Sequence, residues 1–360
     1  MSDHPAARSR ASHPVSGPSL AAVLVCCVLL LWTGAALGQD RYERPPAAPP
    51  GSGDVATDYW RGLRQGQQGV TNSWDGARSD LINVSGQAWT TKRNEEVTKV
   101  GAWAFAIFTG AVVLFYLLRG TIRLEEGRSG KVVERWPMLH RVVHWWVAIL
   151  FLVQLVTGLL LLYGKSLVIP LIGKEAFSSV AMLSKNLHNY LGPLLFVGMV
   201  VMLIAWLNKN LPTLTDLKWF AKGGGLIGKG HASSGFLNGG EKIWFWIVIL
   251  MGGFVAVTGL VLDFPQFGQS RDTMQLMNYL HGIAGLVIGA MSLGHIYIGT
   301  IGTEGAFEGM KTGYVDANWA AQHHDLWYEE VKDQAVDAAE VGVETPKSSG
   351  EGGEARSHPA

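Results

Sequence analysis

Five apolar stretches dominate the pattern of hydrophobic and polar positions along the chain. Each holds about 20 residues with almost no charge, which is the length that an α-helix needs to cross a bilayer core of about 30 Å. The stretches cover residues 100–118, 142–163, 187–207, 243–262 and 279–301. Because polar segments separate them, the pattern predicts an all-α integral membrane protein with five transmembrane helices.

Composition supports this fold class. Hydrophobic residues make up 48% of the chain and charged residues only 16%, whereas about 25% charged residues is usual for a soluble domain. The formal net charge is zero. No overall positive field is therefore available to attract a nucleic acid, and nucleic-acid binding is not expected.

The first 38 residues resemble a secretory signal. Arg8 and Arg10 precede an apolar run over residues 20–32, and small residues follow it before Gln39. We predict a cleavable signal peptide at residues 1–38, with a retained signal anchor as the alternative. Both cysteines of the chain lie inside that apolar run, so the mature chain would have no disulfide and no iron–sulfur ligand. Residues 39–99 are predicted to form a periplasmic extension that is partly disordered.

Lysine and arginine in the short loops predict the orientation. Residues 119–141, a predicted cytoplasmic linker, carry Arg119, Arg123, Arg128, Lys131, Arg135 and Arg141. The segment between the third and fourth stretches carries Lys209, Lys218, Lys222 and Lys229. Basic loops face the cytoplasm, so the first helix would run inward, with residues 302–346 cytoplasmic and residues 347–360 a disordered tail. Three lysines in the predicted outer loop, residues 164–186, make this bias incomplete.

Four histidines lie at or within the ends of the apolar stretches: His144, His188, His281 and His295. An ionisable side chain at membrane depth costs roughly 2.5 kcal/mol or more, so each is a candidate functional residue. His281 and His295 lie 14 residues apart, which places them about 21 Å apart on one helix and within roughly 40° of the same face.

This spacing predicts two stacked haems, each held by two neutral imidazoles. Pairing by depth gives His188 with His281 for the outer haem iron, and His144 with His295 for the inner one. His140, one turn before His144, is a rival ligand closer to the water. The alternative is four interfacial histidines without a ligand. The neighbouring His323 and His324 have no further ligands in sequence, so a packed cap or a subunit contact is expected there.

Several motifs together carry a resemblance to a known family. They are Arg141-Val-Val-His144-Trp145, Asn186-Leu-His188, Asn238-Gly-Gly-Glu-Lys242, His281-Gly-Ile-Ala-Gly285, Gly294-His295-Ile-Tyr297 and Gln322-His-His-Asp-Leu-Trp-Tyr328. With these motifs in this order, the chain resembles the cytochrome b (gamma) subunit of respiratory formate dehydrogenases over about residues 135–330. The exported extension and the extra helix at residues 100–118 resemble the long form of that family.

The resemblance implies a four-helix dihaem cytochrome b domain at residues 142–301, in the bacterial inner membrane. It implies two haem b groups and a quinone acceptor, menaquinone or ubiquinone. The implied partners are an iron–sulfur beta subunit and an alpha subunit with molybdenum or tungsten bound to a pterin, which oxidises formate. This chain would therefore carry electrons from the beta subunit to the quinone and would hold no residue catalytic toward formate.

The family's quinone site matches Asn238 and Gly240, at the start of the helix that follows the basic loop. By this implication, the Asn238 side chain and a backbone amide near Gly240 would hydrogen-bond the quinone. Asparagine before Gly-Gly-Glu is also a typical helix N-cap, so that interpretation stays open.

Three other functions compete with this one. A cytochrome b of another quinone-linked enzyme, such as a membrane-bound hydrogenase, would share the fold and the haems. A transporter would need broken helices or a polar site at the membrane midplane, which the sequence does not indicate. A structural anchor would bind no cofactor.

Overall fold

The computed structural model describes residues 86–225 and 232–343. The predicted signal peptide, residues 1–38, lies outside the described residues, as do most of the predicted extension and the predicted tail.

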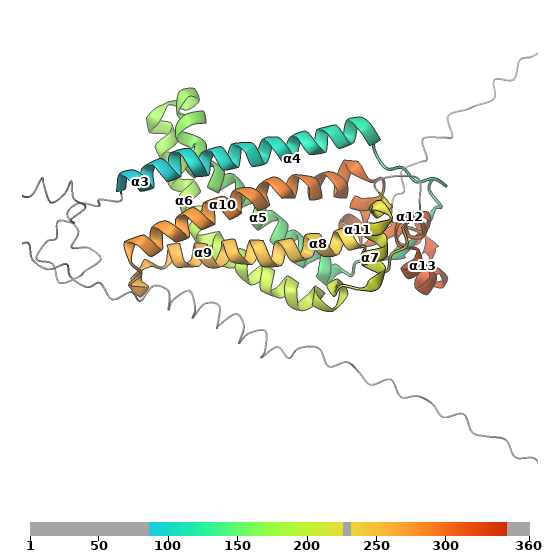
Figure 1. Ribbon diagram of the computed structural model, residues 1–360. Coiled ribbons are helices and arrows are strands. Elements are labelled where there is room, and N and C mark those ends of the chain that lie inside the picture. The colour runs from blue at the N-terminus through green and yellow to red at the C-terminus, as the bar shows by residue number, and fades with distance from the viewer. Residues whose placement is uncertain (1–85, 226–231, 344–360) are drawn as a thin grey trace, which may run out of the picture.

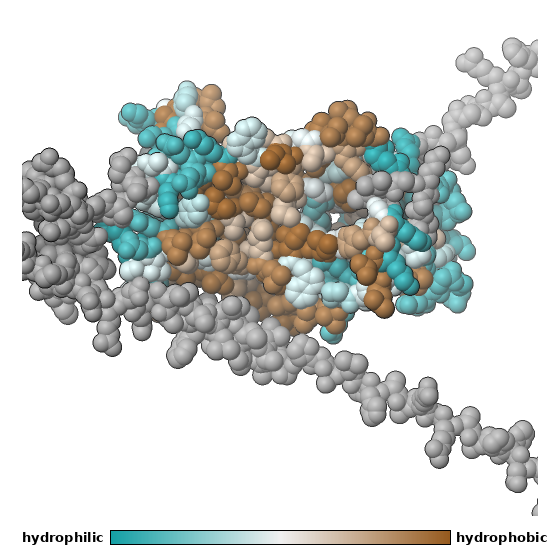
Figure 2. Space-filling view, in the orientation of Figure 1, coloured by the Kyte–Doolittle hydropathy of each residue, from teal (hydrophilic) through white to brown (hydrophobic). Residues whose placement is uncertain are grey.

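Five helical segments in the described ranges are long and apolar enough to cross a membrane, as the sequence predicts. They are Trp89–Arg119, Met138–Leu167, Ile169–Asn210, Gly239–Asp263 and Arg271–Gly302. Figure 1 shows them lying lengthwise beside one another. On the face seen in Figure 2, hydrophobic residues gather over the middle of the bundle and hydrophilic residues at both ends. This distribution suits a protein whose middle contacts lipid.

The first three spans are assembled as follows. The first begins within α3 (Gly86–Thr91) and continues through the π-helical turn η2 (Lys92–Val97) and α4 (Thr98–Arg119). The second is α5 (Met138–Leu167), and the third joins α6 (Ile169–Trp206) to the 3-10 turn η3 (Leu207–Asn210). The short helix α7 (Leu214–Ala221) and the turn η4 (Gly223–Gly225) follow.

The last two spans each contain a π-helical turn. In the fourth, α8 (Gly239–Ile247) continues through η5 (Val248–Gly252) into α9 (Gly253–Asp263). The turn η6 (Pro265–Phe267) leads to α10 (Arg271–Tyr297), which ends in η7 (Ile298–Gly302).

The predicted outer loop, residues 164–186, is not a loop. Helix α5 continues to Leu167 and α6 begins at Ile169, so helical backbone runs through nearly all of it. A break occurs at Gly173, whose φ of 81° is open to glycine and strained for other residues. Because a helix satisfies its own backbone in water as well as in lipid, the helices extend beyond the apolar stretches that define the spans.

Small residues let these helices approach closely. A Cβ atom at Gly101 of α4 would lie 2.3 Å from the Tyr163 hydroxyl oxygen and 2.8 Å from Leu286 of α10. The Tyr163 hydroxyl donates to the Thr98 carbonyl over 2.7 Å. Glycine at such positions is typical of membrane helix interfaces. The extra helix α4 is therefore packed against α5 and α10, and Figure 1 shows it running along α10.

The polar segments at one end of the bundle fold together. Strand β1 (Lys131–Glu134) lies between β2 (Tyr314–Asp316) and β3 (Val336–Asp337), with both pairings antiparallel. Helices α11 (Ala306–Thr312), α12 (Ala317–His323) and α13 (Asp325–Val331), with the turn η8 (Lys332–Gln334), complete this unit. We call residues 120–137 and 303–343 the cap.

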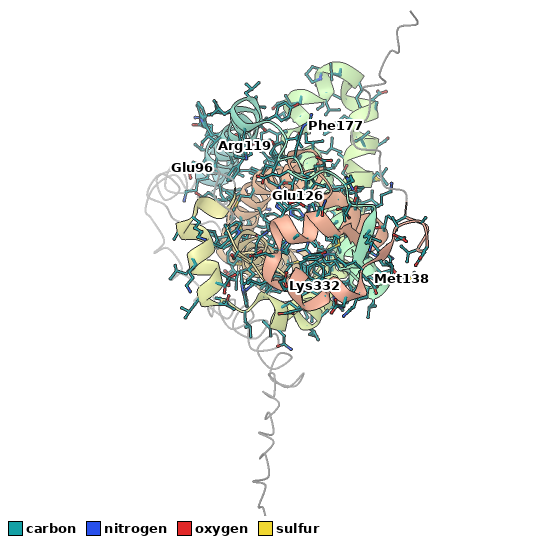
Figure 3. The ribbon with its side chains drawn as sticks, turned by 90° about the vertical axis from the view of Figure 1, so that its right-hand side faces the viewer. Glu96, Arg119, Glu126, Met138, Phe177 and Lys332 are labelled. Carbon is teal, nitrogen blue, oxygen red and sulfur yellow. The ribbon has the colours of Figure 1, made fainter. Side chains whose placement is uncertain are left out.

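The cap has a core of its own, formed by Val133, Val315, Trp319 and Trp327. In the end-on view of Figure 3, Glu126 and Lys332 lie over the end of the helix bundle. The sequence pattern predicts residues 119–141 and 302–346 as separate segments, with no strand in either. The structure joins them because β1 finds its hydrogen-bond partners in a segment more than 170 residues away.

Candidate functional site

His188 of α6 and His281 of α10 face each other. Their ring centroids lie 6.0 Å apart and the ring planes are nearly perpendicular, at 80°. Two metal–nitrogen bonds of about 2 Å, plus about 1 Å from each coordinating nitrogen to its ring centroid, require a centroid separation of about 6 Å. The observed distance fits an iron atom between the two rings.

A repeated Val-Thr-Gly-Leu sequence orients this pair, once on α5 (residues 156–159) and once on α9 (residues 257–260). The Thr157 hydroxyl oxygen lies 2.8 Å from Nδ1 of His188 and 2.7 Å from the Val153 carbonyl oxygen. A hydroxyl has one hydrogen to donate, and the carbonyl can only accept it. The imidazole must therefore donate from Nδ1, which leaves the Nε2 lone pair of His188 free to bind a metal.

The second copy of the repeat does the same for His281. Its Nδ1 lies 2.9 Å from the Val255 carbonyl oxygen and 3.2 Å from the Thr258 hydroxyl oxygen. Because a carbonyl oxygen accepts only, Nδ1 of His281 carries the hydrogen and Nε2 is again free. Both imidazoles of the pair thus have the protonation that haem ligation requires.

The glycines of the repeat leave room for the rings. A Cβ atom at Gly158 would lie 3.3 Å from Cε1 of His188, and one at Gly259 would lie 3.0 Å from Cε1 of His281. None of these four threonine and glycine positions was among the site residues predicted from the sequence. The repeat itself was the available signal. Val-Thr-Gly-Leu occurs once on the helix that precedes the helix of His188 and once on the helix that precedes the helix of His281.

The other two candidate ligands, His144 of α5 and His295 of α10, form a second pair with ring centroids 6.3 Å apart and planes at 57°. Trp244 of α8 stacks on His295, with centroids 4.9 Å apart and planes at 14°. Trp206 lies over His144 at 6.5 Å and 20°. This separation also fits a bis-histidine haem.

His140 does not face His295. Its Nδ1 accepts a hydrogen bond of 2.6 Å from the Trp206 indole, and its ring stacks on Trp206 at 12° and contacts Trp136. The structure therefore brings His144, and not His140, to the second histidine on α10.

Asn238 and Gly240, the candidate quinone residues, lie at the start of α8. The Asn238 side-chain oxygen accepts from the Glu241 amide over 2.9 Å, and the Glu241 carboxylate accepts from the Asn238 amide over 2.9 Å. Asn238 thus caps α8, as its alternative interpretation predicts. Gly240 lies about one helical turn before Trp244, so their Cα atoms are about 6 Å apart along the axis of α8, and the Trp244 ring stacks on His295.

A buried cation of the cap stands beside this helix start. Arg135, whose side chain is 4% exposed, donates from Nη2 to the Phe236 carbonyl over 2.8 Å and to the Glu241 carboxylate over 3.0 Å. The same Nη2 is 3.0 Å from Nε2 of His324. Four aromatic rings surround its guanidinium, those of Trp136, Phe236, Trp319 and Trp327.

His324 is only 1% exposed, which agrees with the packed cap expected at this histidine. Its Nδ1 lies 2.8 Å from the Gly235 carbonyl oxygen, so Nδ1 donates and Nε2 accepts from Arg135. Burial, and secondarily the charge of Arg135, hold the pKa of His324 well below its ordinary value. The ring is therefore neutral at physiological pH.

Comparison with known proteins identifies the family of this chain. Residues 135–313 match the family of prokaryotic cytochrome b561. The chain is also 30% identical, over 224 residues, to the nitrate-inducible formate dehydrogenase cytochrome b556(Fdn) subunit of Escherichia coli K12, covering 60% of this chain and 99% of that relative. The chain belongs to the family of formate dehydrogenase cytochrome b556 subunits.

Other members of this cytochrome b556 family match over similar lengths. The subunit of Haemophilus influenzae is 26% identical over 197 residues, which cover 53% of this chain and 79% of that relative. The cytochrome b556(fdo) subunit of E. coli K12 is 25% identical over 212 residues, covering 58% and 97%. The resemblance drawn from the motifs is thereby confirmed.

As a formate dehydrogenase cytochrome b556 subunit with five apolar helices, the chain is a multi-pass membrane protein of an enzyme complex and binds haem b. Helix α4 lies outside the matched residues 135–313, so its assignment to a long form of the family remains a prediction.

Proposed function

We propose that this cytochrome b subunit carries electrons from an iron–sulfur subunit to a membrane quinone through two haem b groups. The observation that supports this most is the placement of His281 and His295 on one helix, each facing a histidine from a different helix. About 21 Å of helix separates them, so the two pairs lie at different depths and form a path across the membrane.

In this proposal, His188 and His281 hold the outer haem iron, and His144 and His295 hold the inner one. Haem b supplies reversible one-electron transfer when bound. The protein fixes the imidazoles: Thr157 and Thr258 orient the first pair, and Trp206 and Trp244 pack on the second.

The orientation rests on a basic segment that lies mostly within the cap. Residues 119–141 carry six lysines and arginines, and basic segments stay in the cytoplasm. The cap and the His144–His295 pair would then lie on the cytoplasmic side, and the N-terminal extension in the periplasm. An electron moving inward against a negative-inside potential costs about 2.3 kcal/mol per 100 mV, so formate oxidation would store energy.

The proposed partners follow from this orientation. A beta subunit with iron–sulfur clusters would dock at the periplasmic end, near His188 and His281, and deliver electrons from an alpha subunit with a molybdenum or tungsten pterin. The proposed acceptor, menaquinone or ubiquinone, would bind near Asn238 and Gly240. Support for that location is the single helical turn between Gly240 and Trp244, which stacks on His295.

One experiment on the purified complex tests this function. We would record the formate-reduced minus air-oxidised visible spectrum, count haems by pyridine haemochrome and identify every co-purifying chain by mass spectrometry. We expect two b haems per copy of this chain, reduced by formate, beside a pterin subunit. Recovery of a nickel–iron hydrogenase with haems that ignore formate would overturn the proposal.

A further inference from the structure

The short helix α7 (Leu214–Ala221) lies against the first turn of α8. Asp216 and Trp219 are the buried residues of this helix. Leu214 and Leu217, by contrast, are 79% and 68% exposed. Helix α7 thus has one face on the protein and one apolar face turned outward.

The indole of Trp219 rests on the glycine turn that begins α8. A Cβ atom at Gly240 would lie 3.1 Å from Cη2 of Trp219, and one at Gly239 would lie 3.1 Å from Cε3. On the other side, a Cβ atom at Gly224 would lie 2.7 Å from Cη2. The ring is therefore held between two glycine segments, in van der Waals contact with the backbone where the quinone is proposed to bind.

A buried ion pair holds α7 in this position. Lys242 of α8 donates to the Asp216 carboxylate over 2.8 Å, and the two side chains are 11% and 12% exposed. The same carboxylate accepts from the amide and the hydroxyl of Thr213, which caps α7. The contact between α7 and α8 therefore depends on one charged pair as well as on Trp219.

The outward face of α7 is suited to lipid. Leu214 and Leu217 of α7 are exposed, as is Leu211 just before the helix. Lys218 of the same helix supplies a charge of the kind that interfacial helices place at the headgroups.

We propose that α7 is a cover over the quinone site and that Trp219 occupies the place of the quinone ring when the cover is closed. This inference rests on the quinone site proposed above. A flat quinone ring displaces a flat indole from Gly240, and the Asp216–Lys242 pair sets how often α7 leaves. The apparent affinity for quinone is then the affinity of the open state multiplied by the fraction of molecules that are open.

The test uses the purified complex and a fluorescent hydroxyquinoline N-oxide as the quinone analogue, titrated to obtain its dissociation constant. Trp219→Ala removes the competing ring. The double variant Asp216→Asn, Lys242→Met removes the ion pair but keeps an amide to cap α7. We expect both variants to bind the analogue about 3- to 10-fold more tightly than the wild type.

Trp103→Ala is the matched control, because this tryptophan is exposed on α4, and its dissociation constant should equal the wild-type value. Haem content and the visible spectrum report folding for each variant. Weaker binding by Trp219→Ala, with no change in the double variant, would make the indole part of the binding surface and overturn the cover. Unchanged binding in both would also overturn it.

The two proposals fail differently. If the wild-type complex, with haems that formate reduces, does not bind the analogue at all, the quinone site itself is wrong and the cover falls with it. If the wild type binds and the variants do not bind more tightly, only the cover is wrong.

Discussion

The two histidine pairs of this cytochrome are held in different ways. In the His188–His281 pair, each Nδ1 donates a hydrogen bond to a threonine hydroxyl or a backbone carbonyl. In the His144–His295 pair, tryptophans stack on the rings, and Nδ1 of His144 is buried without a hydrogen-bond partner among the described residues.

This difference bears on the haem potentials. A hydrogen bond donated from the outer nitrogen makes an imidazole a more basic ligand, and a more basic ligand stabilises the oxidised iron and lowers its reduction potential. We therefore expect the haem at His188–His281 to have the lower potential. Electrons would then run downhill from that pair to the other, which is the direction of the proposed function.

The largest expected effect separates the two pairs outright. His281→Ala and His295→Ala should each lose one of the two haems, because a haem that has lost one axial ligand is poorly retained. In His295→Ala alone, the remaining haem should still be reduced by formate while quinone reduction stops. Haem stoichiometry by pyridine haemochrome measures the first effect. His140→Ala should retain both haems, and loss of a haem in that variant would mean that His140 is the ligand.

Gly259→Ala should disturb the His281 ring strongly, since the new Cβ atom would lie 3.0 Å from Cε1 of the imidazole. We expect partial loss of one haem and a smaller loss in Gly158→Ala, where the distance is 3.3 Å. Gly253→Ala on the same helix α9 is the control, because nothing lies within 4 Å of its Cβ position. Equal haem content in all three variants would contradict the packing described above.

The cap should become less stable in mild acid. Burial lowers the folded-state pKa of His324 below its unfolded value of about 6.5, so the unfolded cap binds a proton that the folded cap does not. The free energy of unfolding of the cap is therefore highest above pH 6.5. It decreases as the pH drops below 6.5, by at most about 1.4 kcal/mol per pH unit. Hydrogen exchange of β1 between pH 7.5 and 5.5 measures this dependence.

His324→Gln is the matched variant for that experiment, since its amide can still accept from Arg135 but does not titrate in this range. It should show less of the acid-dependent exchange than the wild type. The same acid dependence in both proteins would assign it to another group.

The smallest expected effect tests the comparison of the two pairs most directly. Thr157→Val removes the acceptor of the His188 hydrogen bond and should raise the potential of that haem by a few tens of millivolts, since a hydrogen bond contributes about 1 kcal/mol and 59 mV corresponds to about 1.4 kcal/mol. Thr258→Val should shift it less, because His281 keeps the Val255 carbonyl as acceptor. A redox titration followed at the haem bands would detect both, and an unchanged potential in Thr157→Val would remove the basis of the comparison.

Much of this architecture was determined by the sequence alone. The five spans follow from runs of apolar residues, since the requirement to match a bilayer of about 30 Å acts on each segment locally. The 14-residue spacing of His281 and His295 places both on one face of a helix because the α-helix repeats every 3.6 residues. These local rules, with the family motifs, predicted which histidines would pair.

Only the tertiary structure decided what surrounds those histidines. Thr157 and Thr258, the tryptophans on His144 and His295, and the indole of Trp219 on Gly240 meet their partners across different helices. The same is true of the cap, where β1 pairs with strands from the far end of the chain. A residue's own sequence neighbourhood specifies its burial and its helix, whereas contacts between distant segments depend on how whole helices pack against one another.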